Sequence, residues 1–174
     1  MGWLTRRWRT PVDNGREDFA VQTGLFIIAH APLASALRAT ALHAFPDSGG
    51  AIGVYDVPPG DDTERYLAEA EAVIAALGAD EVLILTDSVG ATPGNLAAQL
   101  VRRGRRRGLA GVNLAMVWRA LNYAQLPLDV LCERAREGAI AAVQPLATPA
   151  PQNQAHPPAL APSAHASLQY HHQQ

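Results

Sequence analysis

Two residues of the sequence are of types that can transfer a chemical group together. His30 ends the apolar run GLFIIAH, and Asp87 directly follows the apolar run EVLILT. A histidine at a strand end can be structural, a metal ligand or a nucleophile, and taken alone it is most often structural. A carboxylate beside it favours the nucleophile, because it accepts the hydrogen of one ring nitrogen and leaves a lone pair on the other. The sequence therefore predicts that His30 and Asp87 act as a pair if the fold brings them together.

The segment SVGATPGN, residues 88–95, supplies a third group next to this pair. Gly90 frees the backbone, Thr92 is the expected N-cap of a helix, and Pro93 suits the first helical position. The amides around Gly90, Ala91 and Thr92 are expected to point into the same crevice and, with the helix dipole, to bind a phosphoryl group. Glycine, threonine and proline begin many helices, so the segment alone is weak evidence. Together with the pair it predicts a phosphohistidine site.

Strands and helices alternate along the chain, and their order decides where these groups lie. Apolar runs predict strands at 24–29, 50–57, 81–86 and 107–112, and helical spacing predicts helices at 32–45, 63–77, 93–103 and twice after residue 112. This alternation is typical of an α/β fold, here a small doubly wound, mainly parallel sheet in the order 2-1-3-4 with helices on both faces. In that order the first and third strands are neighbours, and the site lies between their carboxyl ends. His30 and Asp87 are then expected to face each other.

Composition divides the 174 residues into three parts. Residues 1–22 mix arginine, tryptophan and acidic residues without periodicity and are interpreted as an N-terminal extension. Residues 23–145 form the predicted domain. Residues 146–174 are rich in proline, alanine, glutamine and histidine and carry no charged side chain other than histidine, so we expect a disordered tail.

The overall composition excludes several classes of site. The absence of lysine excludes a P-loop, a Schiff base and the lysine of a response-regulator receiver, and the single Cys132 excludes an internal disulfide and a Cys-rich zinc site. We expect neither a metal nor a cofactor. A formal net charge of −2 favours neither nucleic acid nor an anionic membrane as a partner. Neither a secretory signal nor an apolar run of membrane-spanning length occurs, so we expect a cytoplasmic protein without direct membrane insertion.

Two further patterns favour structural roles. The run RRGRRR, residues 102–107, has five arginines in six positions and is interpreted as a solvated turn, with a partner-docking or nucleic-acid patch as the alternative. Met116, Trp118 and Leu121 recur at helical spacing and are expected in the core or in a dimer interface rather than in a ligand site.

Four segments in this order resemble the mannose-family enzyme IIA domain of the bacterial phosphoenolpyruvate:sugar phosphotransferase system: IIAHAPLASAL, YDVPPGDD, LILTDSVGATPGNLAA, and AGVNLAMVWRALNY continued by LPLDVL. The resemblance spans the whole predicted domain, and the patterns Asp-x-x-Gly-[Gly/Ala]-[Ser/Thr]-Pro and Gly-Val-Asn-Leu are specific to that family. It implies that His30 is the phosphoacceptor, that Asp87 orients it and that the hydroxyl of Thr92 contacts the phosphate. The chain departs from the family at Ala31 (usually Gly), at Ser88-Val89 (usually Leu-Phe or Thr-Trp) and at Ala115 (usually Pro).

The resemblance also implies a function and partners. The domain would accept a phosphoryl group from the phosphocarrier protein HPr, as one component of a membrane-associated sugar-transport complex, and would pass it to a IIB-type partner. It would form a homodimer built partly by exchanging C-terminal strand segments. The alternative is a regulatory phosphoprotein of an incomplete system, with no sugar transport of its own.

Other classes of function fit the residues less well. A response-regulator receiver also has a functional aspartate after its third strand, but it needs a lysine and an acidic pair after the first strand. A Ser-His-Asp hydrolase needs a Gly-x-Ser-x-Gly elbow, which does not occur. The related domain of dihydroxyacetone kinase differs after the aspartate, and a purely structural or binding module remains an alternative.

Overall fold

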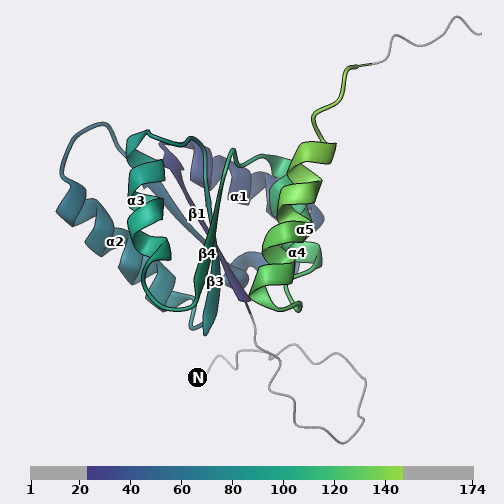
Figure 1. The fold of residues 1–174 in the computed structure, drawn as a ribbon, viewed down its shortest axis with the longest axis horizontal. Helices are drawn as coiled ribbons and strands as arrows, with labels where there is room; N and C mark the ends of the chain where they lie inside the picture. The colour runs from purple at the N-terminus through teal and green to yellow at the C-terminus, as the bar shows by residue number, and fades with distance from the viewer. Residues whose placement is uncertain (1–22, 147–174) are drawn as a thin grey trace, which may run out of the picture. The chain divides into compact units, whose positions relative to one another are not determined.

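A computed structural model of the chain describes residues 23–146 (Figure 1). The predicted extension, residues 1–22, and the tail from residue 147 onward lie outside the described residues. The elements follow one another as β1 (Thr23–His30), α1 (Leu33–Ala44), a 3-10 helix (Pro46–Ala51), β2 (Ile52–Val57), α2 (Thr63–Ala76), β3 (Glu81–Thr86), α3 (Thr92–Val101), β4 (Arg106–Ala110), α4 (Leu114–Asn122) and α5 (Leu128–Ala141).

The four described strands form one parallel sheet in the order β2-β1-β3-β4. Leu25 of β1 lies between Ile52 of β2 and Leu83 of β3. The predicted order 2-1-3-4 and the α/β class are therefore confirmed. Because all four strands run the same way, their carboxyl ends meet at one edge of the sheet, and residues 30 and 87 both lie there.

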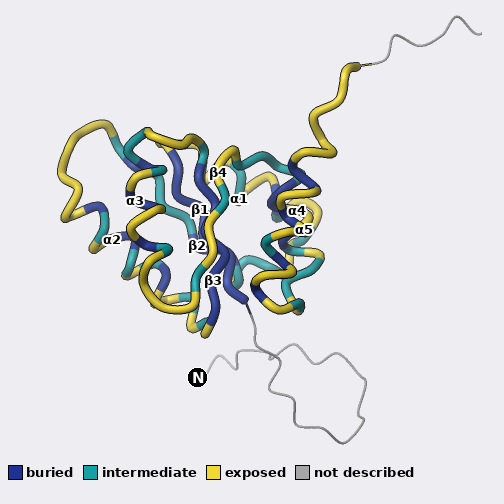
Figure 2. Tube along the Cα trace, in the orientation of Figure 1, coloured by how far each residue is buried: buried dark blue, intermediate teal, exposed yellow. Residues whose placement is uncertain are grey.

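Helices cover both faces of the sheet, which explains the continuous apolar sequence of the central strands. On one face the core includes Leu25 and Ile27 with residues of α1, α4 and α5, and on the other it includes Phe26 and Ile28 with residues of α2 and α3. Figure 1 shows the helices on the two sides of the sheet, and Figure 2 shows that the central strands β1 and β3 are buried between them. β1 is buried along its length except at its last residue, His30. That histidine is thus exposed at the end of an otherwise closed element.

Several element boundaries differ from the prediction for local reasons. The second strand begins at Ile52 rather than 50, because Pro46–Ala51 form a 3-10 helix. The fourth strand ends at Ala110 rather than 112, because Gly111 turns the chain at φ +83° and donates its N–H to the backbone oxygen of Asp87 (3.0 Å). Gly78, at φ +62°, ends α2 as expected of a glycine after a helix.

The arginine run is more than a solvated turn, because four of its five arginines pair with carboxylates from other elements. Arg106 donates to both carboxylate oxygens of Glu71 on α2, at 2.9 and 2.8 Å, and these bonds hold the pKa of Glu71 below its usual range against the opposing effect of burial. Arg103 also contacts Glu71; the other two pairs are Arg105 with Glu81 and Arg107 with Asp129. The run thus fastens the start of the edge strand β4, at the end of the sheet opposite His30.

The apolar residues of α4 divide between core and surface. Met116 is buried, and Leu121 packs against the same core cluster, as expected. Trp118 instead is 40% exposed and lines a groove of about 400 Å³ with Phe45 and Ala115. Among residues 23–146, no helix has the length and apolar character needed to cross a membrane.

Candidate functional site

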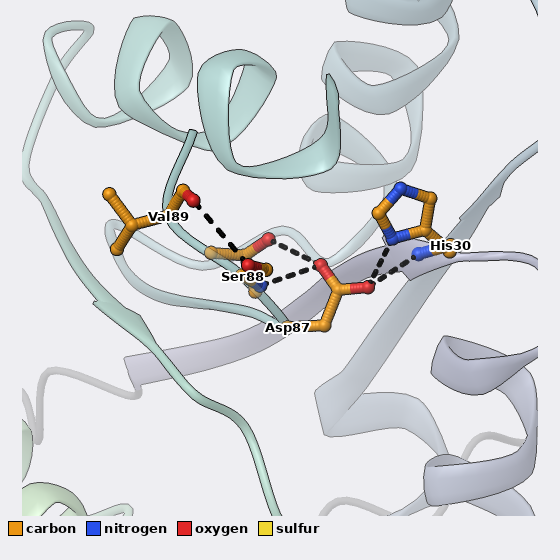
Figure 3. Close-up of polar contacts among 5 residues, drawn as sticks. His30, Asp87, Ser88 and Val89 are labelled. Atoms are coloured by element: carbon orange, nitrogen blue, oxygen red, sulfur yellow. Dashed lines mark hydrogen bonds and ion pairs between the residues drawn. The ribbon is translucent and has the colours of Figure 1, made fainter. Parts of the chain in front are cut away.

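The fold brings His30 and Asp87 into direct contact (Figure 3). The Nδ1 atom of His30 lies 2.6 Å from Oδ2 of Asp87, and the same oxygen accepts the backbone N–H of His30 at 3.0 Å. The two residues are 57 positions apart in the sequence, and they meet because β1 and β3 are adjacent parallel strands that end at the same edge. The predicted juxtaposition is thus present.

The second carboxylate oxygen of Asp87 also has hydrogen-bond partners. Its Oδ1 atom accepts the backbone N–H of Ser88 at 2.8 Å and lies 3.4 Å from the hydroxyl of Thr86. Partial burial by itself raises the pKa of Asp87, but the hydrogen bonds from His30 and Ser88 outweigh it and place this pKa below its usual range. Asp87 is therefore a carboxylate at neutral pH, and a carboxylate can only accept hydrogen bonds.

This arrangement selects the reactive atom of the imidazole. Since Asp87 can only accept, Nδ1 of a neutral His30 carries the hydrogen, and Nε2 keeps its lone pair. Figure 3 shows the second ring nitrogen pointing away from Asp87. The His30 side chain is 56% exposed, against 14% for Asp87, so an incoming group can reach Nε2. The pair can therefore act as a nucleophile with a fixed tautomer.

The lowered pKa of Asp87 makes stability depend on pH in a defined direction. A carboxyl whose pKa is depressed by folding stabilises the fold above its unfolded pKa, about 3.9 for aspartate, and loses this contribution as the pH falls through the folded value. We expect the difference in Tm between the natural protein and Asp87→Asn to be full above about pH 5 and to shrink on acidification. Thermal melts from neutral to acidic pH measure this. A difference that grows on acidification would contradict it, and Asp61→Asn controls for the loss of one exposed charge.

The loop after Asp87 leads into α3 differently from the prediction. The N-cap of α3 is Ala91, with extended backbone angles, whereas Thr92 is the first helical residue and Pro93 the second. The prediction of Thr92 as N-cap is therefore wrong, and no side chain caps this helix. Gly90 adopts φ +83°, as its expected freedom requires.

The start of α3 keeps donors available. The first N–H groups of a helix have no partner inside it, and among the hydrogen bonds of residues 23–146 none uses the backbone N–H of Gly90 or Thr92. The first turn of α3 carries no acidic residue that would repel an anion. The start of α3 is therefore compatible with the binding of an anion by the predicted phosphate contacts, Gly90, Ala91 and Thr92.

A close approach between α3 and the loop fixes the path of residues 88–91. A Cβ atom at Gly94 would lie 2.1 Å from the backbone oxygen of Ser88, which no side chain permits. The side chains of Ser88 and Val89 point outward and are exposed, with Val89 at 84%. The loop can take this path only because residue 94 is a glycine.

One carboxylate beside the site escaped the sequence analysis. Asp56 of β2 lies opposite Ala29 in the sheet and accepts the backbone N–H of Ser35 at 3.1 Å. Its position near the end of the second strand, in YDVPPG, was visible in the sequence, but its partner on α1 was not. In the described part of the chain, no cluster of three or more His, Cys, Asp or Glu side chains could hold a metal ion.

A protein-family model described as EIIA-man, PTS system fructose IIA component, matches residues 24–130, which is more than half of the chain. The chain belongs to the EIIA-man family. The resemblance inferred from the sequence is thereby confirmed, and with it a place among the components of the phosphotransferase system (PTS). A comparison with curated proteins gave no match.

Several solved structures share the fold of this chain, among them two PTS components. The mannose/sorbose specific IIA subunit from Enterococcus faecalis has a TM-score of 0.65 at 22% identity, over 74% of this chain and 98% of its own. Component EIIA from Streptococcus agalactiae has a TM-score of 0.62 at 18% identity, over 71% and 96%. A sigma-54 interaction domain protein from Enterococcus faecalis has a TM-score of 0.59 at 17% identity, over 71% and 95%. At these identities the likeness concerns the fold.

Proposed function

We propose that this EIIA-man domain is a phosphoryl carrier that accepts a phosphoryl group from phospho-HPr on Nε2 of His30. The observation that carries the proposal is the 2.6 Å contact between Nδ1 of His30 and Asp87, which leaves Nε2 free and exposed. The lone pair of Nε2 attacks phosphorus, a new N–P bond forms, and the bond between phosphorus and the donor breaks. The ring gains positive charge, which the Asp87 carboxylate stabilises.

The start of α3 is the proposed site for the phosphoryl oxygens. Three oxygens carry the negative charge of the group, and backbone amides around Gly90, Ala91 and Thr92 with the Thr92 hydroxyl are the donors we assign to them. The absence of a side-chain cap and of an acidic residue in the first turn of α3 supports this assignment. No metal takes part in the proposed step.

We further propose that the phosphoryl group passes to a IIB-type partner of a sugar-transport complex in the cytoplasm. The regulatory alternative, a phosphoprotein whose phosphorylation is itself the output, is favoured by the likeness to a sigma-54 interaction domain protein. Both functions need the same chemistry at His30. They differ in what removes the phosphoryl group.

Reconstitution tests both proposals. Radiolabelled phosphoenolpyruvate, enzyme I and HPr should label the protein, and the label should survive alkali and be lost in acid, as a phosphohistidine is. A IIB component is then added to the labelled protein. Transfer of the label supports the carrier, whereas retention favours the regulatory phosphoprotein. A protein that takes no label contradicts both.

We also propose a homodimer. In the described residues, β4 pairs with β3 alone, as β2 pairs with β1 alone at the other edge of the sheet, and an edge strand is costly to leave unpaired. Trp118 and the groove beside it add exposed apolar surface on α4. We expect sedimentation at micromolar concentration to give a dimer, also for a chain truncated to residues 23–145, the domain limits we propose. A monomer at moderate salt would contradict the interface.

A further inference from the structure

Asp56 makes a helix-capping contact across two elements. Its Oδ1 atom accepts the backbone N–H of Ser35, the third residue of α1, at 3.1 Å. Within α1 itself, Pro32 stands at the N-cap, no side chain makes a cap hydrogen bond, and the first turn has no acidic residue. A capping oxygen usually comes from the N-cap residue and accepts the N–H of the second or third helical residue. Here the carboxylate of a neighbouring strand takes that place.

The contact fixes the chain that leads away from His30. His30 lies beside Val57 in the sheet, and the backbone N–H of Ala31 donates to the oxygen of Val57 at 3.1 Å. Four residues later, Ser35 is tied to Asp56 by its N–H, and its hydroxyl donates to the oxygen of Pro32 at 3.0 Å. The corner between β1 and α1 is thus anchored to β2 at its start and at its end.

His30 is in this way held from both sides of its strand. Asp87 of the β3 side binds its ring and its backbone N–H, while β2 holds the five residues that follow it through Val57 and Asp56. A ring that must keep Nε2 in line with an incoming phosphorus atom depends on both anchors. Small displacements of a reacting group lower rates steeply, by up to about a hundredfold for 1 Å.

We propose that Asp56 is a positioning residue for phosphoryl transfer, which holds the β1–α1 corner so that Nε2 of His30 stays aimed at the donor. The inference rests on the proposed function of His30. It also assigns different roles to the two helix starts: the carboxylate of Asp56 occupies the start of α1, and the start of α3 is left for the phosphoryl oxygens.

The chain offers a matched control in Asp62. Its Oδ1 atom accepts the N–H of Arg65 at 3.2 Å, so it caps α2 as Asp56 caps α1. Asp62→Ala and Asp56→Ala each remove one carboxylate and one cap bond, and Asp62→Ala also removes the exposed ion pair between Asp62 Oδ2 and Arg65 Nε (3.0 Å). Only Asp56→Ala removes a contact of the β1–α1 corner next to His30. Asp56→Asn keeps an oxygen that can accept the Ser35 N–H but removes the charge.

Single-turnover phosphorylation rates, measured at increasing concentrations of phospho-HPr, distinguish these variants. We expect Asp56→Ala to lower the maximal rate about tenfold, with little change in the donor concentration at half-maximal rate. The maximal rate of Asp56→Asn should stay within about twofold of that of the natural protein. Asp62→Ala should have the natural maximal rate, although its Tm should fall as much as that of Asp56→Ala. A normal rate for Asp56→Ala, or an equal loss in Asp62→Ala or Asp56→Asn, would overturn the proposal.

A second measurement stands apart from phosphorylation. The ring-nitrogen resonances of His30 should move in Asp56→Ala and stay in place in Asp62→Ala. Unmoved resonances overturn the positioning role, whereas failure of the natural protein to accept phosphate overturns the proposed function alone. If Asp56→Ala does not fold, Ser35→Pro removes the same N–H at a position where a helix tolerates proline, and Ser35→Ala is its control. Ser35→Pro should then reproduce the shift, and its failure to do so overturns the proposal.

Discussion

Replacing His30 with alanine should abolish phosphorylation by phosphoenolpyruvate, enzyme I and HPr. The reaction needs the lone pair of Nε2, and alanine supplies no nucleophile. The fold should survive the change, because the His30 side chain is 56% exposed and its backbone lies in a strand that is otherwise fully buried. Incorporated radiolabel measures the effect, and a normal Tm shows that the variant is folded.

The control uses the other histidine of the described residues. His43 lies in the last turn of α1, is exposed, and is far along the helix from the site. His43→Ala should be labelled as fully as the natural protein. The variant His30→Ala keeps the remaining five histidines of the chain, including those after residue 147. Label on His30→Ala would therefore assign the phosphoacceptor to another residue and overturn the proposed mechanism.

Changing Asp87 should slow phosphoryl transfer by about a hundredfold while leaving the protein folded. In Asp87→Asn the amide can donate to Nδ1, which favours the tautomer with the hydrogen on Nε2, and a protonated Nε2 has no lone pair for attack. In Asp87→Ala the ring loses its 2.6 Å partner and its orientation. Single-turnover rates at saturating phospho-HPr measure both effects.

Asp61→Asn provides the matched change of charge for this experiment. Asp61 is an exposed residue between β2 and α2, and its variant should transfer at the natural rate. Rates for both Asp87 variants within twofold of the natural protein would mean that the contact with His30 has no part in the reaction.

The sequence predicted those parts of the site that depend on the order of elements. The run EVLILT is a strand from Glu81 to Thr86 as expected, because a strand buried on both faces carries a continuous apolar run, here Val82 to Leu85 between two buried polar ends. Once the first and third strands are neighbours, their ends must meet, so the contact between His30 and Asp87 followed from topology alone. Local chemistry and connection rules were sufficient for this pair.

The parts that failed depend on backbone angles and on register. Whether Ala91 or Thr92 caps α3 is decided by the angles of Ala91, φ −85° and ψ 168°, which residue preferences do not fix. The cap formed by Asp56 needs the pairing of Ala29 with Asp56 between β1 and β2, and nothing near Asp56 in the sequence indicates Ser35 as its partner. The carboxylates that pair with the arginine run likewise lie on α2, β3 and α5. These partners are remote in the sequence, so local periodicity could not predict them.

The close contact at Gly94 has a consequence for how such a domain can change its partners. Since the oxygen of Ser88 lies where a side chain at residue 94 would be, the path of the loop depends on Gly94 and on the positive φ of Gly90 rather than on the side chains of Ser88 and Val89. Ser88 and Val89 are exposed, and the Ser88 hydroxyl donates only to the neighbouring backbone oxygen of Val89 at 3.4 Å, so we expect both side chains to tolerate replacement. Single substitutions at Ser88 or Val89 can therefore change the surface beside His30 that a partner protein recognises. They leave the contact between His30 and Asp87 unchanged, so the partner can change while the reaction stays the same.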